Sequence, residues 1–352
     1  MPAPLVDLRS DTVTKPSPAM RKAMHDAEVG DDVYREDPTV NRLQDRAAEI
    51  FGREAGLYVV SGTMGNQTAI KVLTRHGQEV ICEDRCHIYN FEMGMVTAFS
   101  GVVPRTIHAE DGILTWDLIA PHVRPRNDHR ARTGLIELEN TSNLAGGSVY
   151  PLTNTHEIVH HAHAAGLPVH LDGARIFNAS VAMGKSVVEL TQGFDSVMFC
   201  LSKGLGAPVG SMLVGSKEFI EEARIVRKML GGGMRQAGVL AAAGLIALEE
   251  SPKGLNVDHD NAQFLAQELA HIPGIKIDAA KVVTNILFFN VAETGMTAHE
   301  ISKLLAAQGV LANATNPQTI RMVTHLDVDR AGCERAMQVL REVVAPRRAA
   351  AS

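Results

Sequence analysis

The sequence has few cysteines, and their scarcity excludes two kinds of architecture. Four cysteines occur in 352 residues, at positions 82, 86, 200 and 333, and none forms a CxxC pair. Neither a disulfide framework nor a cysteine zinc site is therefore indicated. We expect these residues to be ordinary packed thiols, and we expect no bound metal.

Long apolar runs and an excess of positive charge are also missing. Met1 to Asp11 lacks the apolar stretch of a signal peptide, and the longest apolar run, Val239 to Leu248, is too short to cross a bilayer. The formal net charge of −6 argues against nucleic acids and anionic membranes, which attract clustered Lys and Arg. We expect a cytoplasmic protein that acts on a small molecule.

The composition is that of an ordinary globular protein. Hydrophobic residues make up 45% of the chain and charged residues 21%, so the polar bias of disordered chains is absent. At roughly 150 residues per domain, the length suggests about two packed units.

Strand and helix patterns alternate along the first two thirds of the chain. Buried strands are predicted at 57–61, 79–82, 134–138, 168–172, 196–201 and 210–214. Between them, apolar residues at three- and four-residue intervals predict helices at 39–51, 63–74, 156–165 and 217–230. This alternation is typical of an α/β fold with a mainly parallel sheet wrapped by helices.

After about residue 256 the pattern changes to a smaller α+β domain. Helices are predicted at 262–270, 299–307 and 333–343, and strands at 285–291 and near 320–324. We therefore expect an N-terminal arm over residues 1–20, a large domain over 21–255 and a small C-terminal domain over 256–352.

A lysine and an acid follow two of the predicted strands of the large domain. Lys203 comes after the strand 196–201, and Asp172 ends the strand 168–172. In an α/β sheet such strand ends face the ligand crevice, where a desolvated lysine can form an imine and an acid can pair with a pyridinium nitrogen. Taken alone, Lys203 could equally be a solvated turn residue, Asp172 a cap and Arg175 a surface ion pair.

A third strand leads into a candidate phosphate site. Ser61-Gly62-Thr63-Met64-Gly65-Asn66 follows the strand 57–61 and opens a helix, so free backbone N–H groups and the helix dipole would favour an anion. Gly62 would let the backbone approach that anion. The alternative is a plain strand-to-helix turn capped by Ser or Thr.

In combination, these segments resemble the low-specificity L-threonine aldolases of the aspartate-aminotransferase-like superfamily of pyridoxal 5′-phosphate (PLP) enzymes. The resemblance covers nearly the whole chain and rests on the segments 7–14, 30–34, 61–63, 171–178, 200–206 and 231–236. It implies a PLP-transferase fold, with a seven-stranded, mainly parallel sheet in the large domain. It also implies PLP-dependent cleavage of L-threonine, L-allo-threonine and related β-hydroxy-α-amino acids to glycine and an aldehyde.

The resemblance further implies roles for the matching residues. Lys203 would carry PLP as a Schiff base, Asp172 would pair with the ring nitrogen and His87 would stack on the ring. The remaining cofactor contacts would come from Gly62, Thr63, Ser202 and Arg175, with Lys228 and Arg235 contributed by a neighbouring subunit. A homo-oligomer, namely a dimer of dimers, is therefore expected.

The resemblance also implies the substrate contacts. The carboxylate would bind Ser10, Arg175 and Arg321, because a planar guanidinium suits a bidentate carboxylate. Tyr34 would lie near the cofactor, and His129 would act on the substrate hydroxyl, although a solvated loop histidine is an equal alternative at position 129. Ser142 stands where the family usually has histidine, so the aldehyde specificity stays open.

Other functions remain as alternatives at this point. A β-eliminating lyase or an amino-acid racemase could use the same PLP scaffold. His156-Glu157-Ile158-Val159-His160 fits the HExxH pattern of zinc peptidases, but a solvated helix face explains it better.

Overall fold

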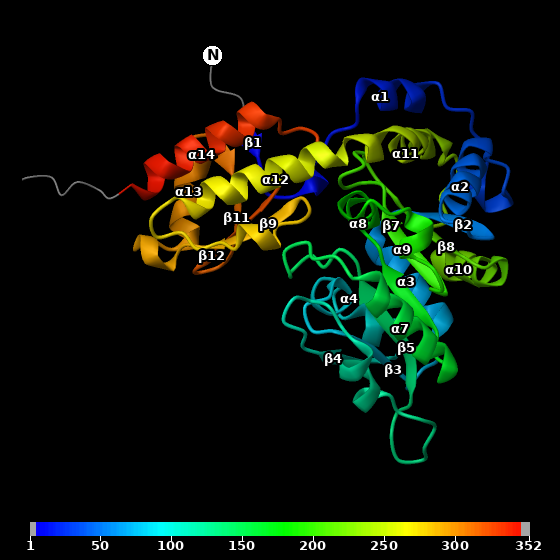
Figure 1. Ribbon diagram of the computed structural model, residues 1–352. Helices are drawn as coiled ribbons and strands as arrows, with labels where there is room; N and C mark the ends of the chain where they lie inside the picture. The colour runs from blue at the N-terminus through cyan, green and yellow to red at the C-terminus, as the bar shows by residue number, and fades with distance from the viewer. Residues whose placement is uncertain (1–4, 346–352) are drawn as a thin grey trace, which may run out of the picture. The chain divides into compact units, whose positions relative to one another are not determined.

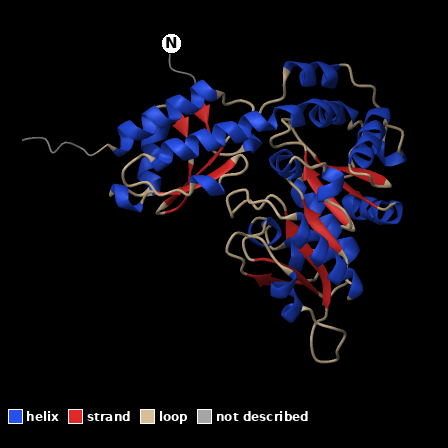
Figure 2. Cartoon of the chain, viewed as in Figure 1, coloured by secondary structure: helices blue, strands red, loops and turns tan. Residues whose placement is uncertain are grey.

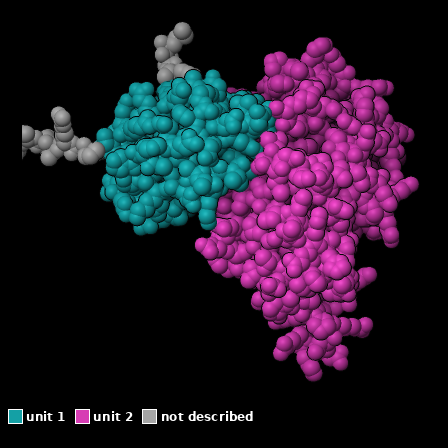
Figure 3. Space-filling model, viewed as in Figure 1, with its two compact units in different colours: residues 1–14, 254–352 teal, residues 15–253 magenta. Residues whose placement is uncertain are grey.

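The computed structural model describes residues 5–345, and the chain divides into two compact units. Unit 1 comprises residues 1–14 and 254–352, and unit 2 comprises residues 15–253 (Figure 3). In the described residues, no helix has the length and apolar character needed to span a membrane.

Unit 2 is built on one seven-stranded sheet in the order β2-β8-β7-β6-β5-β3-β4 (Figure 1). Its strands are β2 (Ala55–Val59), β3 (Glu79–Glu83), β4 (Val103–Ile107), β5 (Thr133–Glu139), β6 (Val169–Asp172), β7 (Ser196–Cys200) and β8 (Ser211–Gly215). β8 runs antiparallel to both of its neighbours, and the other pairs are parallel. The predicted mainly parallel sheet is confirmed, with β4 as a strand that the sequence patterns did not indicate.

Both faces of this sheet are covered, which explains the composition of its strands. Every residue of β3, β5, β6, β7 and β8 is buried. Parallel strands that are buried on both faces read as continuous apolar runs instead of alternating patterns. Glu137 and Glu139 interrupt the run of β5, and they are fully or almost fully buried.

Unit 2 also contains helices, most of which pack around the sheet (Figure 2). The longer ones are α1 (Pro18–His25), α2 (Pro38–Ile50), α3 (Gly62–Leu73), α7 (Leu152–Ala164), α8 (Ile176–Met183), α10 (Lys217–Met229) and α11 (Gly238–Glu250). Single-turn helices are α4 (His87–Asn90), α5 (Met95–Ala98), α6 (Trp116–Ile119) and α9 (Val187–Leu190). The apolar run near 239–248 lies in α11, a helix that the sequence patterns did not indicate.

Serine caps fix where two of these helices begin. The side chains of Ser61 and Ser216 accept hydrogen bonds from the first turns of α3 and α10. The two helices then pack their apolar faces on β2, β7 and β8 in one core that includes Leu57, Met198 and Ala223. The N-terminus of α3 is therefore held at a defined place beside the sheet.

Unit 1 has its own sheet and core. The strands β9 (Ile286–Asn290), β11 (Asn313–Asn316) and β12 (Thr319–Val323) form an antiparallel sheet, and β1 (Val6–Asp7) pairs in parallel with β10 (Val310–Leu311). The helices α12 (Leu255–Ala270), α13 (Ala298–Ala307) and α14 (Arg330–Val344) complete the unit. The first described residues thus add a strand to unit 1.

Candidate active site

The carboxyl ends of four strands meet at one edge of the sheet in unit 2. β5 ends at Glu139, β6 ends at Asp172, and β7 is followed by Ser202 and Lys203. β2 runs parallel to β7, since β8 lies antiparallel between them, so α3 also begins at this edge. Ligands of open α/β sheets bind at this edge.

Asp172 is a buried acceptor at the centre of this edge. Asp172 is only 1% exposed. One oxygen, Oδ1, accepts the backbone N–H of Ala174 at 3.0 Å, and Oδ2 accepts Nδ2 of Asn66 at 2.7 Å. Both oxygens thus have a hydrogen-bond donor, and the carboxylate lies where it could pair with a protonated ring nitrogen.

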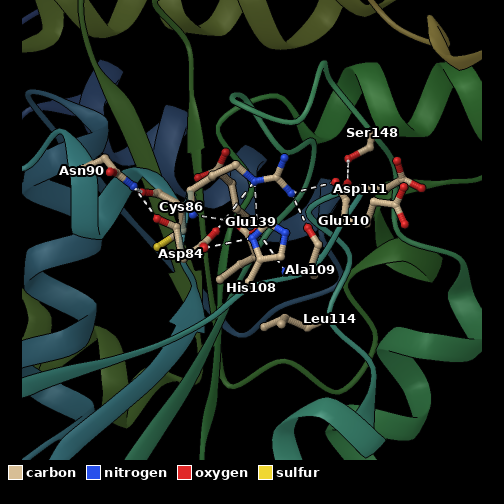
Figure 4. Close-up of polar contacts among 12 residues, drawn as sticks. Asp84, Cys86, Asn90, His108, Ala109, Glu110, Asp111, Leu114, Glu139 and Ser148 are labelled. Carbon is tan, nitrogen blue, oxygen red and sulfur yellow. Dashed lines mark hydrogen bonds and ion pairs between the residues drawn. The ribbon is translucent and has the colours of Figure 1, made fainter. Parts of the chain in front are cut away.

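His87 lies beside Asp172 because the turn after β3 is held at several points. Nδ2 of Asn90 donates to the carbonyls of Asp84 and Cys86, both at 2.9 Å (Figure 4). The backbone N–H of His87 donates to Oε2 of Glu139 at 2.6 Å. The first residue of α4 is therefore tied to the end of β5.

The imidazole of His87 pairs with a buried glutamate. Its Nδ1 lies 2.8 Å from Oε1 of Glu92, which is 0% exposed. Burial alone lowers the pKa of His87, but the bond to Glu92 and the charge of Asp172 outweigh burial, so the pKa is raised. The positive charge of Lys203 acts in the opposite direction and lowers the pKa of His87.

Glu139 is a second buried carboxylate of this edge. Its neighbour across the sheet is Asp172, and it accepts the N–H groups of His87 and Asn143, each at 2.6 Å. Burial raises the pKa of Glu139 to about 7, and the charge of Asp172 adds to the effect. Glu139 thus holds the segments on both sides of the strand end.

Asn66 connects Asp172 with Glu92. Its Nδ2 donates to Oδ2 of Asp172 at 2.7 Å and to Oε1 of Glu92 at 2.8 Å. Nε2 of Gln67 donates to the other oxygen of Glu92 at 2.7 Å. Neighbouring residues of α3 therefore hold two carboxylates in place.

The hydrogen bonds continue from Asn66 to the next two strands. Nε2 of His170, on β6, lies 3.1 Å from Oδ1 of Asn66, and its Nδ1 lies 2.7 Å from Oγ of Ser196 on β7. Burial lowers the pKa of His170 to about 4, so this ring is neutral. We call the residues His87, Glu92, Asn66, Gln67, Asp172, His170 and Ser196 the Asn66 network.

Lys203 stands in the connection between β7 and β8. The N–H groups of Leu201 and Ser202 donate to the carbonyl of Gly210, at 3.0 and 3.3 Å. Gly210 has a φ of +104°, and a Cβ there would lie 2.4 Å from the ring of Tyr58, so only glycine fits. The tight turn keeps Ser202 and Lys203 at the sheet edge.

The start of α3 has the close packing expected of a phosphate site. A Cβ at Gly62 would lie 3.0 Å from Sγ of Cys200, and one at Gly65 would lie 2.6 Å from Cγ of Met198. The two glycines let the first turn of α3, with Gly62 and Thr63, approach the end of β7. Backbone N–H groups at this end suit a phosphate, and together with Asp172, His87 and Lys203 they fit PLP.

Arg175 lies in the same region, because it immediately precedes α8 and follows the end of β6 by three residues. It is only 6% exposed. A buried guanidinium beside the strand end is suited to bind a carboxylate.

The predicted substrate residues Ser10 and Arg321 belong to unit 1. The side chain of Ser10 accepts the N–H of Thr12 at 3.2 Å, which caps a short helical turn. Arg321, on β12, donates to the carbonyl of Arg9 at 3.1 Å. The structure therefore brings the arginine next to the segment that carries Ser10.

Three further predicted residues lie on the surface of unit 2. Tyr34 is 70% exposed, and Arg235 is exposed and pairs with Asp31 at 2.9 Å. The Lys228 side chain runs close to Gly233, where a Cβ would lie 2.7 Å from Cδ of the lysine. Within one chain, these three residues are not members of the Asn66 network.

His129 lies at the opposite end of β5 from Glu139. It is exposed in the loop that precedes Thr133, and its N–H donates to Oδ1 of Asn127 at 2.7 Å. The seven residues of β5, at about 3.3 Å each, separate its two ends by about 20 Å. Its role in cleavage thus stays a prediction that requires a second chain.

Ser142, which replaces the usual family histidine, lies in a buried turn near the end of β5. It is 2% exposed, and its N–H donates to the carbonyl of Ser148 at 3.0 Å. A Cβ at Gly112 would lie 2.6 Å from Oγ of Ser142, so this side chain is closely packed.

Sequence reasoning missed Glu92, Gln67, His170 and Glu139, and it gave no role to Asn66. All five are almost fully buried. The available signal was a polar residue at a position where the strand or helix pattern predicts burial, since buried polar groups need partners.

The HExxH segment is a solvated helix face, as the pattern of apolar residues predicted. In α7, His156, Glu157 and His160 are exposed, whereas Ile158 and Val159 are buried. None of the three belongs to a group of potential metal ligands within residues 5–345.

Comparison with known proteins gives a consistent set of relatives. The family model of the beta-eliminating lyases matches residues 7–294. The chain is 46% identical over 325 residues to low-specificity L-threonine aldolase 1 of Arabidopsis thaliana, covering 91% of each protein. It is also 46% identical over 327 residues to the low specificity L-threonine aldolase of Escherichia coli strain K12, covering 93% of this chain and 95% of the relative.

Solved structures agree on the fold. The threonine aldolase of Leishmania major superposes with a TM-score of 0.80 at 20% identity, covering 97% of this chain and 100% of that one. A structure of SPT with PLP gives a TM-score of 0.76 at 16% identity, covering 96% and 87%. The predicted PLP-transferase fold is thus confirmed.

Proposed function

Because the chain belongs to the beta-eliminating lyase family, we propose that it cleaves L-threonine, L-allo-threonine and related β-hydroxy-α-amino acids to glycine and an aldehyde, with PLP as cofactor. The observation that carries this proposal is the sheet edge where Lys203, Asp172 and the first turn of α3 meet beside the Asn66 network. The family resemblance read from the sequence is confirmed by the same relatives.

The residues at this edge of the sheet would each have a separate role in the reaction. Lys203 would bind the cofactor aldehyde and later hold or release a proton at its Nζ, and His87 would cover one ring face. Asp172 would keep the ring nitrogen protonated. When bound, PLP supplies the electron sink for the charge left as the Cα–Cβ bond breaks.

The substrate would be fixed by its carboxylate. Arg175, Arg321 and Ser10 would be the contacts of the substrate carboxylate. His129 would accept the proton of the β-hydroxyl, directly or through a water. Tyr34 would border the same space.

We further propose that the enzyme works as a homo-oligomer, a dimer of dimers, in the cytoplasm. Gly62, Thr63 and Ser202 would hold the phosphate together with Lys228 and Arg235 of a neighbouring chain. The surface positions of Tyr34, Arg235 and His129 support this proposal, because a second chain could bring them to the site.

A second candidate reaction is β-elimination, which the description of the family model favours. It uses the same cofactor residues but breaks a bond between Cβ and a leaving group. Racemisation at Cα is the third outcome of the same scaffold.

One experiment separates these reactions. Glycine, aldehyde, ammonia and D-amino acid are measured after incubation with threonine, allo-threonine, phenylserine and serine. We expect glycine and aldehyde in equal amounts, and ammonia without glycine would instead establish elimination. Lys203→Ala should abolish turnover, while Lys185→Ala, in an exposed pair with Glu189, should leave it unchanged; unchanged turnover in Lys203→Ala would refute the proposal.

A further inference from the structure

We propose that Glu92 is a positioning residue that sets the orientation and the proton of His87, and that Asn66 couples this pair to Asp172. The inference rests on the proposed function in one respect, namely that His87 and Asp172 face the cofactor. It predicts that the stacked histidine and the acid of the ring nitrogen are held by one hydrogen-bonded unit.

Glu92 is the buried anchor of this unit. It is 0% exposed and accepts three hydrogen bonds, from Nδ1 of His87 and Nδ2 of Asn66 on one oxygen and from Nε2 of Gln67 on the other. Two of the three donors are neutral amides. A buried carboxylate needs a compensating charge, and His87 is the ionisable donor among the three.

The hydrogen-bond chain leaves one consistent arrangement of protons. Both amide hydrogens of Asn66 are directed at carboxylates, so its Oδ1 accepts from Nε2 of His170. The neutral His170 then accepts the hydroxyl hydrogen of Ser196 at Nδ1. At the other end, Glu92 only accepts, so Nδ1 of His87 carries a hydrogen and only Nε2 remains for cofactor or substrate.

The coupling to Asp172 follows from the shared donor. Oδ2 of Asp172 and Oε1 of Glu92 each take one hydrogen from the same amide. A movement of either carboxylate would break or bend the other bond. Gln67 and Asn66 are consecutive residues of α3, whose first turn would hold the phosphate, so the unit also ties His87 to the phosphate end of the site.

The main variant is Glu92→Gln, which keeps the size of the side chain and removes its charge. Carbethoxylation of His87 by diethyl pyrocarbonate, which requires the neutral ring, is followed against pH by peptide mass spectrometry on the purified enzyme. We expect the midpoint to fall by about one pH unit or more. Glu79→Gln is the matched control, because Glu79 is buried at the other end of β3 and pairs with Arg105 and Arg124.

Kinetics separate positioning from mere packing. We expect Glu92→Gln to lower kcat by about tenfold or more with little change in KM. In a His87→Phe background the same change should cost less than about twofold, since its effect passes through His87. An equal loss in both backgrounds, or an unchanged midpoint, would overturn the inference.

Glu92→Asp is a second variant, made in case Glu92→Gln does not fold. It keeps the charge but withdraws it by one methylene, so its midpoint should lie between those of wild type and Glu92→Gln. If only this variant can be purified, a midpoint equal to wild type overturns the inference. Failure of the wild type to release glycine would instead refute the proposed function, and the midpoint test would still decide the role of Glu92.

Discussion

Replacing Gly65 with alanine tests how closely α3 must pack on β7. The new Cβ would lie 2.6 Å from Cγ of Met198, whereas two carbons in contact lie about 3.5 to 4.0 Å apart. Either Met198 leaves its position or the helix moves away from the strand by about 1 Å. Overpacking of this kind costs about 1 to 3 kcal/mol, and the better helix propensity of alanine returns at most about 1 kcal/mol.

Because an approach of 2.6 Å is severe, we take the upper half of that cost, about 2 to 3 kcal/mol, and the expected net loss is about 1 to 2 kcal/mol. For a unit of this size, thermal unfolding should shift down by about 2 to 8 °C. Calorimetry and urea unfolding measure this loss, and equilibrium dialysis of PLP reports whether the first turn of α3 has moved. Cofactor retention should weaken with stability, because Gly62 and Thr63 belong to the displaced turn.

Gly254→Ala is the control for the loss of a glycine. Its Cβ would meet no atom within 4 Å, and its φ of −101° suits alanine. This variant should unfold within about 0.5 kcal/mol of the wild type. If Gly65→Ala is as stable as Gly254→Ala and retains PLP equally well, the close approach of α3 to β7 does not shape the cofactor site.

Four other changes test separate parts of the site. Asp172→Asn should lower kcat for glycine release by about two to three orders of magnitude, since it leaves one partner of a buried charge pair alone; a loss below tenfold would contradict that role. Arg235→Ala should weaken PLP retention in dialysis, and full retention would argue against a phosphate contact from a neighbouring chain. His129→Phe should slow cleavage or alter the preference between threonine and allo-threonine, and wild-type rates on both would remove it from the mechanism. The neutral ring of His170, with its pKa near 4, stabilises the fold above about pH 6.5, and this contribution is lost as the pH falls through about 4; denaturant unfolding against pH should show a drop of about 3 kcal/mol that His170→Gln lacks.

Much of the fold was predictable because its strands are buried on both faces. Strands such as β7 and β8 are almost continuous apolar runs between helices with clear apolar stripes, so their order and type could be read directly. β4 was missed because Pro104 and Arg105 interrupt its short pattern. α11 was missed because its own glycine, alanine and leucine residues are spread over every side of the helix. No apolar stripe next to a polar face was therefore present to indicate a helix.

The site was predictable only in part, for a different reason. Lys203, Asp172 and Gly62 could be singled out because each lies at the end of a predicted strand or follows it, and strand ends meet at one edge. Glu92 and Asn66 could not, because their importance depends on contacts between α3, the segment that follows α4, and β6, and no local pattern encodes these contacts. Tyr34, Lys228, Arg235 and His129 came from resemblance alone, and they remain predictions.

Both hydrogens of the Asn66 amide are used, one for each carboxylate, and this restricts which substitutions the chain can accept. A change to aspartate at position 66 would bring three carboxylates together, and a change to leucine would strip a donor from two of them. Single substitutions at positions 66, 92 or 170 should therefore be rejected, while paired replacements could survive. Saturation libraries of these three codons, selected for growth that depends on glycine release, should yield compensated combinations in place of independent changes.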